Sequence, residues 1–597
     1  DLKIKPEITA HGGEILSSVP GQSYDRLSGT SMAAPNQAGA TALIRQYVKY
    51  SGVFGTYAKD GSRDIDDNDV TAIVNQLMMS TADIVYNKNG LPYAVRKQGA
   101  GLVNMKKSTT TASYIQTYDK NGNEMDKTKL ELGDDKNKTG VYEMSFDIKN
   151  ISGGAVSYDI SSIVITEGVS KTYTSHSDTT VTQDGYLLNA DTKVVSVTSG
   201  SQDGNKVTVS ANSSARGNVK ITLSNGDKAY LNKSFKHGMY VEGFVTLKAV
   251  SGTDVSVNVP LLAFYGDWTE APIFDEEYYD TNVDEINSGK NDEDKLMADA
   301  YATRVIGSLY SDYISTLGSY YFVQNPAATQ IAADKDKIAI SNQQTEYNYT
   351  VNSVYSIWAG FLRNVKYADI TIVEDSTGNV VFTREESNLR KSFSSGGNIY
   401  YSAVKTEFSA IDYALKNNTR YTVTVKTYID YGSKEDQNNV RNTFEFPLYI
   451  DFEAPALKNV TFTTEYDKTT ETNKLFANLE IYDNHYAMGV QLGQITDAEP
   501  GSGYSFSMKS FGKYITPVYS SFNSTSVVTI ELTDYVSQIK NSKGIKYNED
   551  GTYEKVSNNS FVATCYDYAM NTATYEVSLP DEVIDMYFGQ EDITLSE

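Results

Sequence analysis

A regular alternation of apolar and polar residues recurs along most of this chain and constrains its fold more than any other feature. The alternation is clear at 141–148 (VYEMSFDI) and returns at 368–374, 420–428 and 526–532. Because successive side chains of a β-strand point to opposite faces of the sheet, this period indicates strands with one buried face. Turn residues such as Asn, Ser and Gly separate the runs. The pattern predicts a series of mainly antiparallel β-sandwiches.

Length and composition agree with several strand-rich domains. The chain has 597 residues, whereas single hydrophobic cores stop growing at roughly 250–300 residues. Its 46 tyrosines against 12 prolines also favour strands. Changes in periodicity and charge predict six segments: an α/β segment at 1–110, a first sandwich at 111–275, an acidic connector at 276–329, a second sandwich at 330–452, a third at 453–580 and an acidic tail at 581–597.

The net charge of −24 argues against several classes of partner. So acidic a protein repels phosphate backbones and anionic lipid heads, and we expect no nucleic acid partner. No run approaches the roughly 18 apolar residues that span a bilayer, so we expect no membrane insertion. The single cysteine, Cys565, excludes an internal disulfide and is expected to be a small core residue of a strand.

The first segment carries the helical patterns of the chain. Residues 31–49 (SMAAPNQAGATALIRQYVK) begin with small residues and continue with apolar ones, which predicts a helix. Its small side chains would allow it to lie deep in a core. A second helix is predicted at 69–82, and the glycine-rich stretch 98–104 closes the segment.

Ser31 stands just after a glycine turn, at the N-terminus of the first helix. Such a turn exposes a hydroxyl, and a helix N-terminus offers free N–H groups and a positive dipole end to a developing oxyanion. Serine also caps helices very often, so a purely structural N-cap is the alternative interpretation. Ser31 stands within the longer motif Gly29-Thr-Ser-Met-Ala-Ala-Pro35.

That motif resembles the nucleophile motif of the subtilisin family of serine proteases. Residues 4–18 (IKPEITAHGGEILSS) resemble a second segment of the family, and Met79-Ser-Thr-Ala82 with Gln98-Gly-Ala-Gly101 resemble its closing elements. Further on, 239–245 and 259–268 look like the fibronectin-III-like module of the lactocepin-like cell-envelope proteinases. The resemblance implies a multi-domain protein: a partial α/β subtilisin-type segment followed by three fibronectin-III- or Ig-like sandwiches.

The resemblance also implies a serine endopeptidase that is secreted or bound to the cell wall of a Gram-positive bacterium and acts on proteins or peptides. Ser31 would attack the scissile carbonyl, a histidine would take its proton, and an aspartate would orient the histidine. In the family both partners precede the serine, and none of the histidines at 11, 176, 237 and 485 stands in such a motif. We therefore expect a fragment that needs the missing N-terminal part of the catalytic domain and is inactive alone.

Two features near the motif are expected to be structural. His11 is the histidine nearest to Ser31 in sequence, but a base also needs an orienting carboxylate and hydrogen-bond reach, so a loop histidine is expected. The acidic run Asp64-Ile-Asp-Asp-Asn-Asp69 lacks the glycine at position six and the distal glutamate of an EF-hand loop, so an exposed acidic turn is expected. The chemistry requires no cofactor, and no metal-binding residue is assigned. A structural calcium ion stays open.

Two other interpretations stay open as well. The chain could be a non-catalytic, adhesin-like or substrate-docking stalk with a protease remnant, or one of two associated fragments of an internally cleaved protease. Intact aspartate and histidine motifs upstream would favour the enzyme over the stalk.

Overall fold

The computed structural model describes residues 2–588 with gaps and divides into two compact units. The gaps are at 56–66, 171–179, 253, 276, 281–301, 310–312, 320–332, 343–351, 396–397, 401, 411, 436, 438–441, 499–505, 512–514, 541, 548–552 and 558. The first unit comprises Asp1–Ala271 and Tyr431–Asn438, and the second comprises Pro272–Asp430 and Asn439–Glu597. An α/β segment followed by several antiparallel sheets confirms the predicted fold class.

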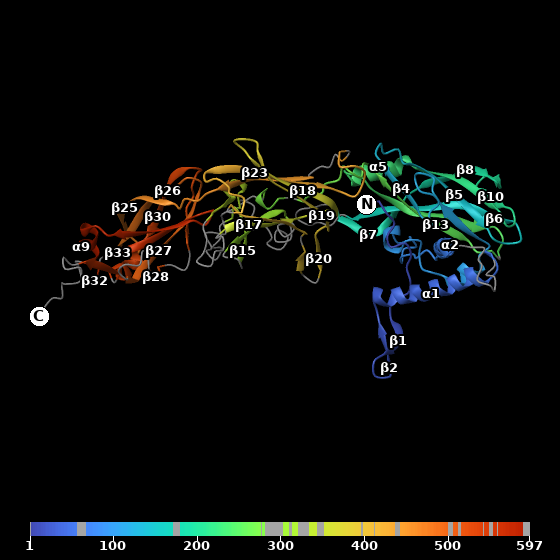
Figure 1. Cartoon of the computed structure of the whole chain (residues 1–597), viewed down its shortest axis with the longest axis horizontal. Coiled ribbons are helices and arrows are strands. Elements are labelled where there is room, and N and C mark those ends of the chain that lie inside the picture. The colour runs from blue at the N-terminus through green and yellow to red at the C-terminus, as the bar shows by residue number, and fades with distance from the viewer. Residues whose placement is uncertain are drawn as a thin grey trace. The chain divides into compact units, whose positions relative to one another are not determined.

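The first unit begins with a β-hairpin and four helices (Figure 1). These elements are β1 (Ile15–Val19), β2 (Ser23–Leu27), α1 (Thr30–Tyr50), α2 (Asp67–Ser80), α3 (Val95–Gln98) and α4 (Met105–Thr110). The hairpin projects beside the start of α1 in Figure 1. Helices α1 and α2 correspond to the two predicted helices at 31–49 and 69–82.

Helix α1 is only partly buried, so the expectation that it lies deep in a core is wrong for the described residues. Its C-terminal half packs on α2, where Ile44 and Val48 meet Val70, Val74 and Leu77. The small residues of its N-terminal half are exposed or half-buried. Small side chains permit close packing, but in the N-terminal half the described contacts leave Ala34, Pro35, Ala38 and Gly39 exposed.

A two-sheet sandwich completes the first unit. One sheet has the order β3-β5-β11-β8 and the other β4-β13-β12-β6-β10-β9, with β7 paired to β6. The strands are β3 (Ser113–Thr117), β4 (Leu130–Asp135), β5 (Val141–Asn150), β6 (Val156–Ser170), β7 (Thr180–Leu187), β8 (Ala190–Thr198), β9 (Ser201–Asp203), β10 (Lys206–Val209), β11 (Ser214–Leu223), β12 (Met239–Ala249) and β13 (Val257–Tyr265). Alternate residues of β5 and β11 face one apolar core between the sheets, as the sequence periodicity predicts.

Strand β13 is buried along its whole length because it is covered on both faces. Leu261 belongs to the core between the two sheets, whereas its neighbour Leu262 packs with Ile4 and Val95 of the α/β segment. The sandwich also contains a helix that the sequence analysis missed, α5 (Asn225–Ser234). A capping box formed by Ser224 and Asp227 starts this short helix.

The second unit contains four larger sheets and two small hairpins. The first two sheets have the orders β15-β14-β17-β22 and β16-β24-β23-β18-β19. Their strands are β14 (Arg304–Leu309), β15 (Tyr313–Thr316), β16 (Ala339–Ile340), β17 (Asn352–Ala359), β18 (Val365–Glu374), β19 (Val380–Leu389), β22 (Ser402–Phe408), β23 (Thr419–Tyr428) and β24 (Thr443–Ile450), and β20 (Phe393–Ser395) pairs with β21 (Asn398–Tyr400). Short 3-10 helices lie at Tyr278–Asp280 (η1) and Lys335–Lys337 (η3).

Two further sheets with one apolar core follow, in the orders β25-β26-β30 and β28-β27-β33-β34. The elements are β25 (Ala456–Asp467), β26 (Thr472–Asp483), β27 (Ala487–Ala498), β28 (Phe506–Ser510), β29 (Thr516–Pro517), β30 (Ser524–Glu531), η4 (Thr533–Tyr535), α8 (Val536–Lys540), β31 (Lys543–Tyr547), β32 (Tyr553–Ser557), β33 (Ser560–Asp567), β34 (Thr572–Ser578) and α9 (Asp581–Phe588). Cys565 of β33 is fully buried in this core, as expected.

Two segments differ from the sequence-based prediction. Residues 304–316 were assigned to the acidic connector at 276–329, but they form β14 and β15, and β14 pairs with β17. The acidic residues nearby masked the short alternation in RVIGSL. The predicted tail at 581–597 begins with helix α9, because Val583 packs into the adjacent core.

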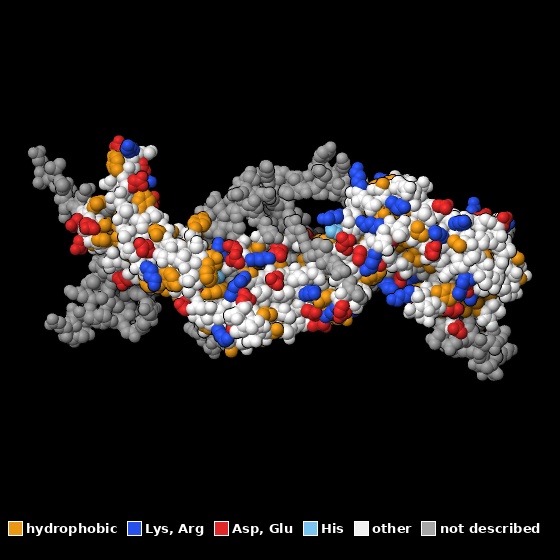
Figure 2. Space-filling view, turned by 90° about the horizontal axis from the view of Figure 1, so that it is seen from above, with side chains coloured by type: hydrophobic (Ala, Val, Ile, Leu, Met, Phe, Trp, Pro, Cys, Tyr) orange, Lys and Arg blue, Asp and Glu red, His pale blue; other side chains and the backbone are white. Residues whose placement is uncertain are grey.

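On the face shown in Figure 2, acidic and basic side chains are interspersed.

Candidate active site and the contacts that position it

Ser31 lies in the first turn of α1, and its side chain is exposed. The N-cap residue is Gly29, whose carbonyl accepts hydrogen bonds from the N–H groups of Met32 (3.1 Å) and Ala33 (3.2 Å). Within the described residues, no hydrogen bond is formed by the Ser31 hydroxyl, and Gly29 provides no side-chain cap. An exposed hydroxyl and free N–H groups at a helix N-terminus are what an acyl-transfer nucleophile requires.

The turn before Ser31 is held by close contact with residues 12–14. The Gly29 N–H donates to the Gly12 carbonyl at 2.8 Å, and the Glu14 N–H donates to Ser28 Oγ at 2.9 Å. A Cβ atom on Gly12 would lie 2.7 Å from the Gly29 oxygen and 2.9 Å from Ala33 Cβ. Residue 12 must therefore be glycine for the turn to approach the helix this closely.

The other segments that resemble the subtilisin family lie together beneath this helix pair. The Thr9 N–H donates to the Gly101 carbonyl and the Ala100 N–H to the Glu7 carbonyl, each at 2.9 Å. A Cβ on Gly99 would lie 2.2 Å from the Glu7 carbonyl carbon, so the two segments touch through their backbones. Segments that lie about 90 residues apart in sequence thus form one structural unit.

No described histidine joins Ser31 to form a catalytic pair. His11 is exposed next to Gly12 and forms no hydrogen bond with Ser31 or with a carboxylate among the described residues. His237 lies in the first sandwich and His485 in the second unit, while His176 is outside the described residues. The acidic run at 64–69 also falls largely outside the described residues, with only its end entering α2. Among the described residues, Ser31 therefore has no histidine partner.

A buried ion-pair cluster fixes the α/β segment to the first sandwich, and the sequence analysis missed it. Arg96 of α3 donates to Glu242 of β12 from Nε (3.1 Å) and Nη2 (2.8 Å), and it also pairs with Glu167. Its guanidinium lies 3.7 Å from the centre of the Tyr240 ring. Nearby, Asn258 Nδ2 donates to the Ala82 carbonyl at 2.8 Å. These contacts join residues 71 to 176 apart in sequence, and no local motif marks them.

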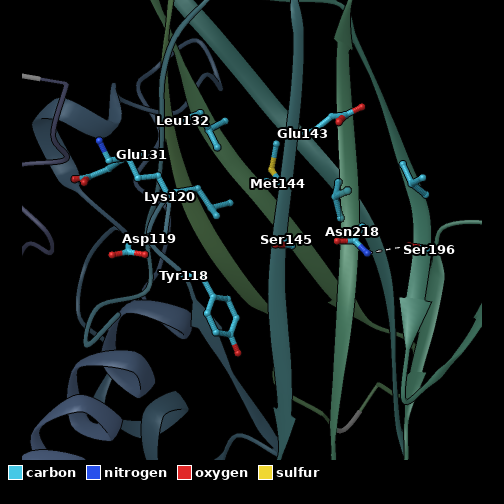
Figure 3. A pocket seen from close by; sticks show the side chains of 13 residues that line it. Tyr118, Asp119, Lys120, Glu131, Leu132, Glu143, Met144, Ser145, Ser196 and Asn218 are labelled. Atoms are coloured by element: carbon cyan, nitrogen blue, oxygen red, sulfur yellow. Dashed lines mark hydrogen bonds between the residues drawn. The ribbon is translucent and has the colours of Figure 1, made fainter. Parts of the chain in front are cut away.

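A hollow of about 550 Å³ opens in the first sandwich rather than at Ser31 (Figure 3). Residues of β4, β5, β8, β11 and the 118–120 turn line it, and its polar groups include Glu143 and the hydrogen-bonded pair Asn218 and Ser196. The lining residues include no histidine that could act as a base for the serines.

A second group of reactive side chains lies in the second unit. Asp451, Asp483 and Asp567 are buried, and one carboxylate oxygen of each lies within 4.8 Å of the others. The sequence analysis assigned no metal-binding residue, because these aspartates are far apart in sequence. The one available signal is that each of them stands at the end of a strand or directly after it.

Two models of known protein families match separate parts of the chain. The sequence model of the subtilase family matches residues 1–101, and that of an Fn3-like domain matches residues 130–262. No helix in the described part of the chain has the length and apolar character needed to cross a membrane.

Three curated relatives are similar to larger parts of the chain. The PI-type proteinase of Lactococcus lactis subsp. cremoris is 27% identical over 489 residues, which are 79% of this chain and 23% of that protein. The C5a peptidase of Streptococcus pyogenes serotype M1 is 26% identical over 528 residues, 82% of this chain and 41% of the relative. The PIII-type proteinase of L. lactis subsp. cremoris strain SK11 is 30% identical over 46% of this chain and 13% of its own length.

The chain thus spans well under half the length of each of these relatives. The two matched segments follow one another along the chain, with the subtilase match first and the Fn3-like match after it. The chain is therefore similar to the lactocepin-like cell-envelope proteinases, with a subtilase-type segment followed by an Fn3-like domain.

Proposed function

We propose that this chain is part of a subtilisin-like serine endopeptidase in which Ser31 is the nucleophile that forms the acyl-enzyme. The observation that carries the proposal is the position of Ser31: an exposed hydroxyl in the first turn of α1, within the segment that matches the subtilase family. A serine that only capped the helix would accept a hydrogen bond from the N–H of the second or third helical residue. The N–H groups of Met32 and Ala33 donate instead to the Gly29 carbonyl.

In the proposed reaction Ser31 Oγ attacks the scissile carbonyl carbon while a histidine takes the hydroxyl proton. The Ser31 backbone N–H contributes to the oxyanion hole, since it lies in the first turn, where helical N–H groups lack internal acceptors. The same histidine then protonates the leaving amine, and water hydrolyses the ester. Histidine and aspartate come, in this proposal, from a part of the catalytic domain outside this chain, because His11 has no carboxylate partner among the described residues.

The exposed half of α1 supports a larger catalytic domain. Ala34, Pro35, Ala38 and Gly39 are exposed, although a stripe of small residues is suited to close contact with another element. The rest of the subtilase fold would cover this stripe and bring the histidine to Ser31. The rigid turn formed by Gly12 and Gly29 would hold the serine in place for both partners.

The substrates are proposed to be proteins or peptides outside the cell, in keeping with the names and the cell-envelope class of the relatives. The sandwiches would then hold the catalytic domain away from the wall or guide protein substrates to it. The firm attachment through Arg96 and Glu242 supports a fixed position of the first sandwich beside the catalytic segment.

The test uses the full gene product that contains this chain, in three forms: unchanged, Ser31→Ala and Ser18→Ala. Ser18 is the control because it is an exposed serine of the neighbouring strand β1. We expect Ser31→Ala to reduce kcat for casein hydrolysis by about 10⁶-fold and to abolish labelling by a fluorophosphonate, while Ser18→Ala keeps both.

Activity that survives in the Ser31→Ala protein would refute the role of this serine. The 597-residue chain by itself should neither hydrolyse casein nor react with the fluorophosphonate, because a serine without its base is a poor nucleophile. If the unchanged full protein were also inactive, the docking-stalk interpretation would replace the enzyme.

A further inference from the structure

Three buried aspartates meet within the second unit, at the junction between the second and the third sandwich of the chain. Asp451 directly follows β24, Asp483 is the last residue of β26, and Asp567 is the last residue of β33. Their exposed fractions are 0%, 1% and 0%. One carboxylate oxygen from each lies within 4.8 Å of the other two. Three acidic groups are thus enclosed together at the ends of three strands.

Each of the three carboxylates accepts hydrogen bonds from neutral donors. The Asn484 side chain donates to Asp451 Oδ1 at 2.8 Å, and the His485 N–H donates to Asp483 Oδ1 at 2.8 Å. Asn571 donates to both oxygens of Asp567, at 2.8 Å from its N–H and 2.7 Å from its side chain. These bonds fix the orientation of the carboxylates but bring no positive charge.

The remaining oxygens of two of these aspartates have no partner. Asp451 Oδ2 and Asp483 Oδ2 are both buried and accept no hydrogen bond in the described part of the chain. The charged groups that act on the three aspartates are other carboxylates, including Glu453. A buried acceptor without a donor is costly, and a buried charge without a counter-charge is more so. The fold therefore presents oxygens that are oriented toward one another and lack a positive partner.

The donor set selects the class of cation. It consists of carboxylate oxygens, which hard cations prefer, and the three grouped atoms include neither a thiolate nor an imidazole nitrogen. Calcium–oxygen bonds are about 2.3–2.6 Å long, so two oxygens bound to one calcium ion lie up to about 5 Å apart. The observed separations fit that limit. Magnesium needs shorter, octahedral bonds and usually keeps several waters, which suits an enclosed site less well.

We propose that Asp451, Asp483 and Asp567 bind a calcium ion that fastens the third sandwich to the end of the second. Asp451 belongs to the connection between the sandwiches, while the other two aspartates belong to the third. Neutral contacts already join the same two sandwiches. Asn571 Nδ2 donates to the Asp451 carbonyl at 2.9 Å, and the His485 ring stacks on Tyr449 of β24 with ring centres 4.2 Å apart. The ion would add three charged bonds to these contacts and stiffen the connection.

The inference does not rest on the proposed protease activity, and it is tested on the 597-residue chain itself. The chain is freed of metal with a chelator, and calorimetry then measures binding of calcium chloride and the unfolding temperature. We expect a dissociation constant below about 10⁻⁴ M and a rise in the unfolding temperature of the second unit by about 5 °C at saturation. Magnesium chloride at the same concentration should have a clearly smaller effect.

Three variants assign the site. Asp483→Asn and Asp567→Asn each keep an oxygen but remove a charge, and should weaken calcium binding by about 100-fold. Asp467→Asn is the matched control in the same sandwich, because Asp467 is bonded to Lys474 at 3.1 Å, and it should bind calcium as the unchanged chain does. A fourth variant, Asp64→Asn with Asp66→Asn, tests the acidic run of the first unit as the rival site.

Terbium luminescence keeps the test decisive if a site variant fails to fold. Terbium that replaces calcium in the unchanged chain should be excited by nearby tyrosines, and calcium should displace it. The proposal is overturned if neither calcium nor terbium binds, if magnesium stabilises the unit as well as calcium does, or if binding is lost only in the variant of residues 64 and 66.

Discussion

Two groups of buried carboxylates, one in each unit, have opposite surroundings. In the first unit Glu242 is 1% exposed, and the guanidinium of Arg96 forms two hydrogen bonds with it. In the second unit Asp451, Asp483 and Asp567 are equally buried but face one another. A buried charge requires a partner in either case. In the first unit the partner of Glu242 is the Arg96 side chain. The three aspartates of the second unit need a cation from solution or must take up protons instead.

The pKa values show the same contrast. Burial would raise the pKa of Glu131 in the first unit, but hydrogen bonds from Lys129 and from the Ile4 N–H outweigh burial and lower it. Burial raises the pKa of Asp451 to about 6, and burial with repulsion from Asp451 raises that of Asp483 to about 7. Glu131 therefore stabilises the fold when charged, whereas charged Asp451 and Asp483 destabilise it until a cation binds.

The largest expected effect comes from removing the partner that the first unit supplies. Arg96→Met leaves the Glu242 carboxylate buried without a counter-charge, and should lower the free energy of unfolding of the first unit by about 3–5 kcal/mol. Urea unfolding followed by the fluorescence of Trp268, in a Trp358→Phe background, measures this unit.

Lys220→Met is the control for that measurement. Lys220 pairs with Glu143 at 3.3 Å, but 72% of the Glu143 side chain is exposed. We expect a loss below about 1 kcal/mol, since exposed pairs contribute little. Equal losses in the two variants would mean that burial does not set the strength of these ion pairs.

An effect of opposite sign is expected in the second unit. Without divalent cations at pH 8, Asp483→Asn removes one of three charges that repel one another, and should stabilise the second unit by about 1–2 kcal/mol. With saturating calcium the same variant should be the less stable protein. Unfolding followed by Trp358 in a Trp268→Phe background measures both states, and a loss of stability in both would mean that the three charges do not repel one another.

Local patterns predicted the elements of this molecule well. The small-to-apolar run at 31–49 became α1, and the alternation at 141–148 became part of β5, because such patterns follow directly from helix and strand geometry. The exposed position of Ser31 was also predictable, since it depends on a turn and a helix start that adjoin in sequence. The environment of the rest of α1 was not, because it depends on which distant elements pack against it.

The buried charge clusters lay beyond local patterns. Asp451, Asp483 and Asp567 stand 32 and 84 residues apart, and only strand pairing brings them together. Arg96 and Glu242 are likewise joined across 146 residues. A sequence shows where aspartates end strands, but the choice of neighbouring strand ends is made by sheet topology. Helix α5 was missed for a different reason, because its ten residues contain few apolar positions.

The smallest expected effect is the change of stability at acidic pH. The sign of this change should differ between the two units. Glu131 Oε1 accepts hydrogen bonds from Lys129 Nζ at 2.7 Å and from the Ile4 N–H at 2.8 Å, so the folded protein holds this carboxylate charged. Its pKa is lowered from the ordinary value of 4.5, and the unfolded chain therefore takes up a proton first as the pH falls. The stabilisation is fully present above the unfolded pKa of 4.5 and is lost as the pH falls through the lower folded pKa.

Glu131→Gln should remove that part of the pH dependence and make the first unit less stable at pH 7, with a smaller loss of stability at acidic pH. Glu143→Gln serves as the control, because the exposed Glu143 has no comparable set of donors. The metal-free second unit should respond in the opposite direction and gain stability as the pH falls from 8 to 5, since its buried aspartates then take up protons in the folded state. Urea titrations of both units at pH 3, 5, 7 and 8 measure the two slopes. Slopes of the same sign would mean that the aspartates of the second unit are already compensated by groups of the protein, and the need for a cation would disappear.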